Sequence, residues 1–431
     1  MEQGFSLSLS SHASGQSQLS ESQFADSCHQ HHQQALLAHY NTLDANDKSA
    51  ILSQASMIDF AAVRSLYDMK EAGKLKMEVS KHDISPITDG FVLTDDAELH
   101  GCRDMGLKAI SQGKVACLVL AGGDASRLGV SVPKGMFNPG IDGINSIFEL
   151  ITRKVKRLSG LSSVVYGEKD DLGRDQIVLC IMTNHQNHDQ IVLFFKDNDY
   201  FGYKTIVFFP QSMSPVISQQ GDILLKANNK ILMAPQGNGT TFQSMVDCGL
   251  FEKLGHWGIE YLHITGVDNI LNKFADPVMV GLCKKRHSDV VCKYAPKKYP
   301  LQKVGVFAKV EGKPYVIEYT HIGDKMAQSK NEEGDLLYNH SNLLNFMLRV
   351  SFLKNEILNP ESLKLLNARF NSATKTVKNY NPKSKTIVEC TAYKFELFVH
   401  DFLTFCQPEK LTLLECKQDD VILIKSRNLH Q

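Results

Sequence analysis

The spacing of apolar residues divides this chain into a helical beginning and a longer region of alternating strands and helices. From residue 35 to residue 70 the apolar positions recur at helical intervals, as in Leu36, Leu37, Tyr40 and Leu43. This spacing predicts a small helical unit. Beyond the mixed segment 71–93, short and continuous apolar runs predict buried strands, at 115–120, 177–182, 206–209 and 261–265.

Amphipathic stretches lie between the predicted strands. They predict helices over 94–110, from a capping box of Ser146 and Glu149, and near 187–197. Strands that alternate with helices in this way are typical of an α/β fold with a doubly wound, mostly parallel sheet. The remaining expectations are a polar, hairpin-like insert at 212–233, a strand hairpin at 304–319, helical segments and loops beyond 345, and a last strand at 421–425.

Composition and charge exclude several classes of protein. Lysine and arginine number 47, as do aspartate and glutamate, so the formal net charge is zero. A protein that binds nucleic acid or an anionic membrane needs a basic surplus, and we expect neither partner. The ten cysteines show no Cys-x-x-Cys spacing, which favours reduced, buried thiols over disulfides or a zinc site. The apolar runs are too short for a membrane span and no signal-peptide pattern opens the chain, so we expect a cytoplasmic protein.

The first 28 residues are rich in Ser, Gln and His. We expect a mobile tail or a weak helix there, because few large apolar side chains are available for a core. His29, His31 and His32 could bind a metal, but this composition favours a solvated polar segment.

A glycine-rich loop follows the strand predicted at 115–120. Gly122 and Gly123 allow backbone N–H groups to approach a ligand, and the cations Arg127 and Lys134 come shortly afterwards. This pattern favours a phosphate-binding loop over surface cations beside an ordinary turn. It is not a P-loop, because Gly-Lys-Ser/Thr is missing, and it is not a dinucleotide fingerprint, which requires further glycines.

Two more loops carry candidate chemistry. Asp268 and Asn269 follow the strand predicted at 261–265, and a carboxylate beside a phosphate site suits Mg²⁺. An Asp-Asn turn without function explains these residues equally well. The segment 234–240, with Pro235, Gly237 and Gly239, is by itself no more than a tight turn.

The first loop resembles the signature loop of eukaryotic UDP-sugar pyrophosphorylases, and most closely that of the UDP-N-acetylglucosamine pyrophosphorylases. The family pattern is approximately L-A-G-G-x-G-T-R-L-G-x-x-x-P-K-G, and this chain departs from it at Asp124, Ala125 and Ser126. The resemblance extends over about residues 35 to 428. It implies a Rossmann-like nucleotidyltransferase fold with an N-terminal tail and helical unit (1–93), a catalytic domain (94–380) and a short C-terminal segment that closes the site (381–431).

The resemblance also assigns roles to individual residues. It implies catalytic roles for Arg127, Lys134 and Lys425, and a magnesium ligand in Asp268. It implies nucleotide contacts by Leu120, Ala121, Gly122, Gly123, Gln211, Gly237 and Asn238, and sugar contacts by Gly239, Glu318, Asn342 and Phe398. The chain departs from the family at Gln236, where the family has Asp, at His340 and Ser341, where it has Ala-Gly, and at His400, where it has an aromatic residue.

The resemblance, together with these residues, implies a uridylyltransferase that converts UTP and N-acetylglucosamine 1-phosphate to UDP-N-acetylglucosamine and pyrophosphate, with Mg²⁺ as cofactor. The same chemistry on N-acetylgalactosamine, glucose or galactose 1-phosphate is one alternative. A catalytically impaired module that binds nucleotide sugars is another, because the acidic Asp124 is unfavourable beside a triphosphate. A Rossmann oxidoreductase is the least favoured. We expect the protein to be a monomer.

Overall fold

A mixed sheet lies at the centre of the molecule. The structure, a computed structural model, describes residues 19–73, 82–88, 96–123, 132–167 and 173–417, and the backbone of residues 7 and 8. The strand order is β1 (Leu7–Ser8), β5 (Ile206–Gln211), β4 (Ile177–Asn184), β3 (Val115–Leu120), β11 (Tyr261–Gly266), β15 (His340–Arg349), β12 (Val290–Pro296) and β18 (Leu411–Glu415). All neighbours are parallel except β15, which runs antiparallel to both β11 and β12. The predicted α/β class with a mostly parallel sheet is confirmed.

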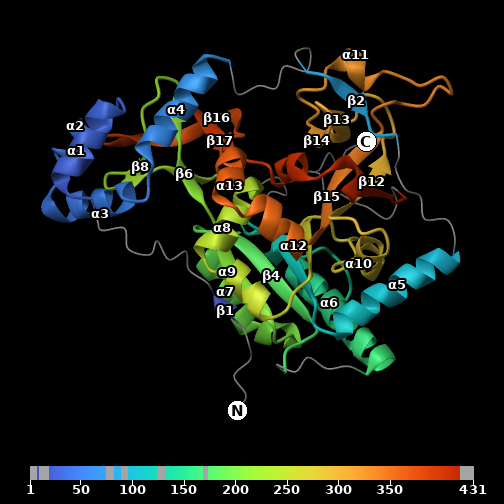
Figure 1. Cartoon of the computed structure of the whole chain (residues 1–431). Helices are drawn as coiled ribbons and strands as arrows, with labels where there is room; N and C mark the ends of the chain where they lie inside the picture. Colours follow the sequence, from blue (N-terminus) through green and yellow to red (C-terminus); the bar gives the residue numbers. More distant parts are fainter. Residues whose placement is uncertain are drawn as a thin grey trace.

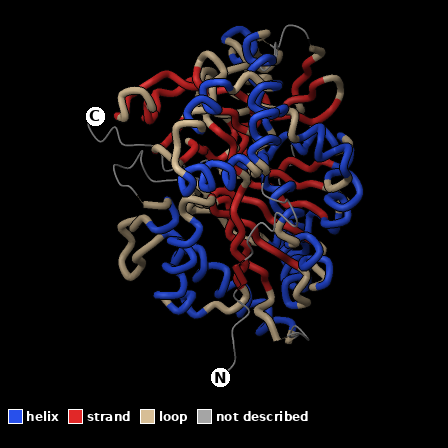
Figure 2. The backbone as a smooth tube through the Cα atoms, turned by 90° about the vertical axis from the view of Figure 1, so that its left-hand side faces the viewer, coloured by secondary structure: helices blue, strands red, loops and turns tan. Residues whose placement is uncertain are grey.

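Helices cover both faces of this sheet (Figures 1 and 2). Successive side chains of β3 point to opposite faces, as the pleat requires, so that Leu118 joins one core and Val119 the other. The core of Leu118 includes α8 (Thr241–Asp247), α9 (Leu250–His256) and α13 (Pro360–Leu366). The core of Val119 includes α5 (Asp96–Ser111), α6 (Ile147–Tyr166), α7 (His188–Asp197) and α10 (Pro277–Lys285). The sheet is therefore doubly wound, as predicted.

The start of α6 follows the predicted capping box only in part. The Ser146 hydroxyl accepts a hydrogen bond from the Glu149 N–H (3.0 Å), as in a capping box. The Glu149 carboxylate, however, accepts from the N–H of Asn145 (2.7 Å) and not from that of Ser146. The cap therefore also ties down the residue that precedes the helix.

Two helices on one face cross with their backbones in contact. A Cβ atom at Gly281 of α10 would lie 2.7 Å from the Cα of Cys102 in α5, and one at Gly106 of α5 would lie 2.6 Å from the Cα of Pro277. Only glycine permits this approach, because real Cβ atoms do not come so close to a backbone. These two glycines determine how deeply α10 packs against α5.

A second unit lies beside the sheet, at the upper left of Figure 1. It combines segments that are distant in the sequence: the helices α1 (Glu21–Gln30), α2 (Gln34–Tyr40), α3 (Ala45–Ala55) and α4 (Phe60–Glu71), short strands of the insert, including β7 (Ile217–Ser218), and a hairpin of β16 (Asn371–Asn381) and β17 (Thr386–Glu396). Their apolar side chains form one shared core, which includes Phe24, Leu66, Ile217 and Phe395.

This unit corrects two expectations. Residues 21–30 form the regular helix α1, which a capping box of Ser20 and Gln23 opens and the buried Phe24 and Cys28 anchor. Of the two alternatives expected here, a mobile tail or a weak helix, the tail is wrong for this stretch and the helix is packed rather than weak. Beyond residue 345 the chain forms the long hairpin of β16 and β17 in addition to helices. The boundary expected between residues 380 and 381 lies inside this hairpin. The strand expected at 421–425 lies outside the described residues.

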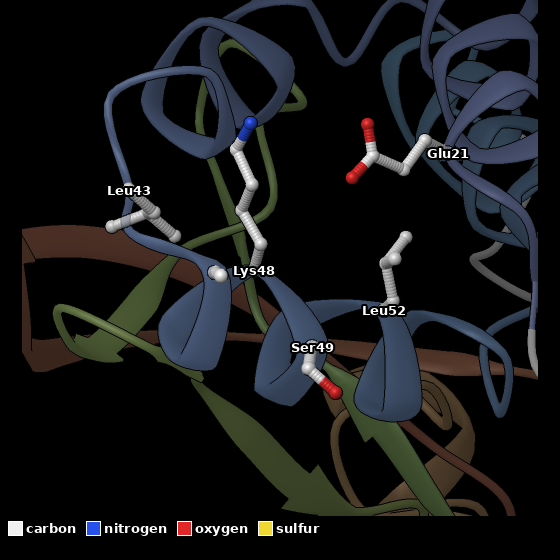
Figure 3. Close-up of a pocket in the computed structure, with 6 residues that line it drawn as sticks. Glu21, Leu43, Lys48, Ser49 and Leu52 are labelled. Atoms are coloured by element: carbon white, nitrogen blue, oxygen red, sulfur yellow. The ribbon is translucent and has the colours of Figure 1, made fainter.

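A shallow groove of about 310 Å³ lies on the N-terminal helices. Figure 3 shows its residues, with the Lys48 side chain rising from α3 and the Glu21 carboxylate directed toward the same space. None of the lining residues is a predicted site residue. The groove is therefore separate from the candidate chemistry described below.

A third element extends the sheet at the upper right of Figure 1. The predicted hairpin is confirmed as β13 (Val306–Val310) and β14 (Lys313–Ile317). On its other side β13 pairs with β2 (Ile84–Pro86), so part of the expected linker 71–93 is a strand. No described helix is long and apolar enough to cross a membrane.

Candidate active site

A cavity of about 370 Å³ opens where parallel strands of the sheet end. Because the carboxyl ends of β3, β4, β5 and β11 meet at the same edge, the loops that follow them converge there. The cavity brings together most of the predicted phosphate, nucleotide and metal residues: Leu120, Gly122, Gly123, Lys134, Gln211, Gly237, Asn238 and Asp268. Ala121 is fully buried between them. Arg127 and Lys425 lie outside the described residues.

The first glycine loop packs directly against the predicted nucleoside contact. A Cβ atom at Gly122 would collide with the side-chain amide of Gln211 and would lie 3.3 Å from the carbonyl oxygen of Thr183. Gln211 is 4% exposed, and its Oε1 has no hydrogen-bond partner among the described residues. A buried amide oxygen without a partner is costly, and a ligand N–H at this position would satisfy it.

Lys134 and Asp268 form an ion pair in the cavity. The Nζ of Lys134 lies 2.8 Å from Oδ2 of Asp268, and both side chains are partly exposed. The backbone N–H of Lys134 donates to the carbonyl oxygen of Gly123 (3.1 Å), and Gly135 packs so closely on the ring of Phe148 that a Cβ would not fit. The structure therefore brings together Lys134, predicted to bind phosphate, and Asp268, predicted to bind the metal. This pairing argues against an ordinary turn with surface cations.

Buried polar groups hold the loop that carries Asp268. His263 of β11 is fully buried, where its Nε2 donates to Oδ1 of Asn345 (2.8 Å) and its Nδ1 accepts from the N–H of Ala275 (2.9 Å). Burial lowers the pKa of His263 to about 4, so the ring is neutral at pH 7. From α6, the Nζ of Lys154 donates to the carbonyl oxygens of Ile270 (2.5 Å) and Asn272 (3.2 Å), and burial lowers its pKa.

The second glycine loop is fixed to the segment that carries Phe398. Oδ1 of Asn238 accepts from the N–H of Val399 (3.0 Å), and the N–H of Gly239 donates to the carbonyl oxygen of Leu397 (2.9 Å). Gly237 has φ +90°, and a Cβ there would lie 2.6 Å from the same Leu397 oxygen. The loop therefore needs its glycine at this position, and its hydrogen bonds join the predicted nucleotide contact Asn238 to the segment of the predicted sugar contact Phe398.

Glu318, Asn342 and Phe398, the other predicted sugar residues, gather around His400. The Nδ2 of Asn342 lies 3.4 Å from Nδ1 of His400, whose Nε2 lies 3.6 Å from Oε1 of Glu318. The rings of Phe398 and His400 stack with centroids 5.2 Å apart. Burial lowers the pKa of His400 to about 3 and raises the pKa of Glu318. Next to them, burial raises the pKa of Asp401 to about 7.

Among the lining residues that were not predicted, Asn184 and Lys394 have clear roles. Asn184, at the end of β4, donates from Nδ2 to the carbonyl oxygen of Gly122 (2.6 Å) and fixes the glycine loop. Its position after a buried apolar run was an available signal. Lys394 of β17 also lines the cavity and pairs with Glu396 (2.8 Å). No sequence pattern identified it, because the hairpin that carries it was not expected.

Comparisons with known proteins identify the class of this fold and site. A family model described as UTP–glucose-1-phosphate uridylyltransferase matches residues 59–391, and the chain belongs to this family. The chain is 32% identical over 329 residues to UDP-N-acetylhexosamine pyrophosphorylase-like protein 1 of Xenopus tropicalis. This match covers 74% of this chain and 63% of that protein. It is 30% identical to the Mus musculus protein of the same name, over 87% of this chain and 75% of the relative.

A microbial relative and a solved structure are both named as UDP-N-acetylglucosamine pyrophosphorylases. A probable UDP-N-acetylglucosamine pyrophosphorylase of Dictyostelium discoideum is 32% identical, over 73% of this chain and 65% of its own length. The chain thus spans somewhat less than two thirds of this relative and of the Xenopus one. The crystal structure of uridine diphosphate N-acetylglucosamine pyrophosphorylase from Trypanosoma brucei has a TM-score of 0.80 at 25% identity, and the match covers 96% of this chain and 83% of that one. The family resemblance expected from the sequence is confirmed.

Proposed function

We propose that this chain is a uridylyltransferase that forms UDP-N-acetylglucosamine and pyrophosphate from UTP and N-acetylglucosamine 1-phosphate. The observation that carries the proposal is the pairing of Lys134 with Asp268 beside two glycine loops at the carboxyl edge of the sheet. Membership of the uridylyltransferase family and similarity to proteins named UDP-N-acetylglucosamine pyrophosphorylase support it.

The reaction requires alignment and charge neutralisation more than covalent catalysis. A phosphate oxygen of the sugar 1-phosphate attacks the α-phosphorus of UTP in line, and the bond from that phosphorus to the bridging oxygen of the β-phosphate breaks. Pyrophosphate leaves with the bonding electrons. The attacking oxygen is already ionised, so the protein supplies no general base. Lys134 would exchange its carboxylate partner for phosphate oxygens and neutralise the charge that develops on them.

Different residues would bind the two substrates. Gln211 offers an amide to the uracil edge, which presents both a donor and an acceptor, and Gly122 leaves room for that amide. Lys394 also lines the cavity and adds a second cation. Glu318 and Asn342 would bind the polar groups of the sugar.

The cavity also suits a magnesium ion. Mg²⁺ is usually bound by one or two carboxylates together with substrate phosphates, and Asp268 supplies such a carboxylate. Among the described residues, no group of three or more acidic, histidine or cysteine side chains is arranged to hold a metal by itself. A bound ion would neutralise phosphate charge beside Lys134. Cytoplasmic location and a monomeric state stay predictions.

The test is pyrophosphate release from UTP and Mg²⁺ with N-acetylglucosamine, N-acetylgalactosamine or glucose 1-phosphate. We expect the highest kcat/KM with the first, and a Lys134→Ala variant should lose about 10²–10³-fold, because it removes one transition-state contact. Lys114→Ala is the matched control. It breaks an ion pair of the same length (2.8 Å, with Glu260) at the other end of β3 and should keep normal turnover. Equal activity of the two variants would contradict the proposal.

A parallel series tests the metal. EDTA should abolish turnover, and Asp268→Asn should raise the Mg²⁺ concentration needed for half-maximal activity. An unchanged magnesium response would remove Asp268 from that role. Binding of UTP without turnover of any of the sugar phosphates would instead indicate a nucleotide-sugar-binding module.

A further inference from the structure

A buried histidine joins the two polar residues predicted to bind the sugar. Glu318 follows β14, Asn342 lies in β15, and His400 lies in the 3-10 helix η7 (Val399–Phe405). The His400 side chain lies between the other two, 3.4 Å from one and 3.6 Å from the other. It is 4% exposed, and its ring also stacks on that of Phe398.

The hydrogen bonds of Asn342 determine which nitrogen of His400 carries the proton. Oδ1 of Asn342 accepts from the N–H of Leu344 (3.0 Å), which leaves its Nδ2 directed at the histidine. Nδ2 can only donate, so Nδ1 of His400 must be the acceptor. A neutral imidazole then has its proton on Nε2, the nitrogen that faces the Glu318 carboxylate.

The distance from Nε2 to Oε1 leaves Glu318 available to a ligand. At 3.6 Å the contact exceeds the normal range of a hydrogen bond, so the N–H orients the carboxylate electrostatically without saturating it. Asn342 likewise uses one of its two amide N–H groups on His400 and keeps the other. Asn342 thus retains a donor and Glu318 an acceptor on the two sides of His400.

We infer that His400 is a positioning residue for the sugar, which orients the Asn342 amide and the Glu318 carboxylate toward one polar substituent of the sugar ring. A donor and an acceptor suit the C=O and N–H of a secondary amide, the group that distinguishes the N-acetylated sugar of the proposed function. It rests on the proposed function. A phenylalanine of similar size could stack on Phe398 but could orient neither partner.

The decisive variants are His400→Phe and His400→Asn. The phenylalanine variant should have a KM for N-acetylglucosamine 1-phosphate about tenfold above that of wild type, while its KM for UTP stays unchanged. A tenfold change corresponds to the binding free energy of about one hydrogen bond. His400→Asn should recover most of this loss, because its Oδ1 can take the place of Nδ1 as the acceptor for Asn342. Thermal unfolding of each variant identifies a general loss of structure, which would change both KM values together.

A sugar KM within twofold of wild type in the phenylalanine variant, or an equal rise in both KM values, overturns the inference. A second measurement separates its failure from that of the proposed function. Calorimetry should show that wild type binds UDP-N-acetylglucosamine more tightly than UDP and that His400→Phe removes this difference, even if no sugar phosphate is turned over. No such difference in wild type also overturns the inference.

Discussion

Because His263 is buried, we predict that the folded protein loses stability when the pH is lowered. Its Nδ1 accepts from the N–H of Ala275, so protonation of the ring would place two donors against each other in a site without water-accessible surface. The folded protein therefore resists protonation, and burial lowers the pKa of His263 to about 4. In the unfolded chain the same ring titrates near its ordinary value of 6.5.

The size of the effect follows from proton linkage. Between these two pKa values the unfolded state binds a proton that the folded state does not, so stability is complete above about pH 6.5 and falls as the pH is lowered toward 4. Each pH unit in this window costs about 1.4 kcal/mol. Lowering the pH from 7 to 4.5 should therefore cost about 3 kcal/mol through His263 alone.

The assay compares wild type with His263→Gln, which cannot titrate. Urea unfolding is followed by the fluorescence of Trp257, the single tryptophan of the chain. The variant loses free energy of unfolding at pH 7, because the Ala275 N–H is left without its acceptor, but this deficit should shrink by about 3 kcal/mol at pH 4.5. Contributions of other groups, such as His400, cancel in the difference. A deficit independent of pH would refute the reasoning.

Two further predictions concern the support of the site and of the fold. Lys154→Met keeps the aliphatic stem but removes the hydrogen bonds to Ile270 and Asn272. The Mg²⁺ concentration needed for half-maximal activity should rise several-fold. An unchanged concentration would show that the loop of Asp268 holds its position without Lys154. Gly281→Ala forces a methyl group into the backbone of α5 and should cost about 2–4 kcal/mol in urea unfolding. Gly160→Ala, in α6 with open space around it, should instead be neutral or stabilise by up to about 1 kcal/mol; equal effects at the two glycines would be inconsistent with the close helix crossing.

The central sheet was predictable because its strands are buried on both faces. Runs such as 115–120 and 261–265 are continuously apolar, and this is the pattern that a strand covered by helices on both sides requires. The rule that parallel strands end at one edge then brings Lys134 and Asp268 together. The antiparallel β15 was not predictable, because alternation of strands and helices does not reveal the direction of a strand inserted between two others.

The hairpin of β16 and β17 lacks a continuous apolar run for a physical reason. Most of its side chains are exposed or half-buried, and a segment such as 371–381 consists mainly of Lys, Thr and Asn. Neither a continuous apolar run nor a regular alternation marks it as a strand, so Lys394 was missed with it. Glu318, Asn342 and Phe398 were predicted only from the family resemblance, because nothing local connects residues so far apart.

The shared core of the second unit has a consequence for synthesis of the chain. Leu66 of α4 and Phe395, next to the end of β17, belong to the same core, yet several hundred residues must be translated between them. At about 5–20 residues per second, roughly 15–65 seconds separate their appearance from the ribosome. During that interval the apolar faces of the N-terminal helices lack their final partners. The growing chain therefore exposes apolar surface on these helices that the finished molecule covers.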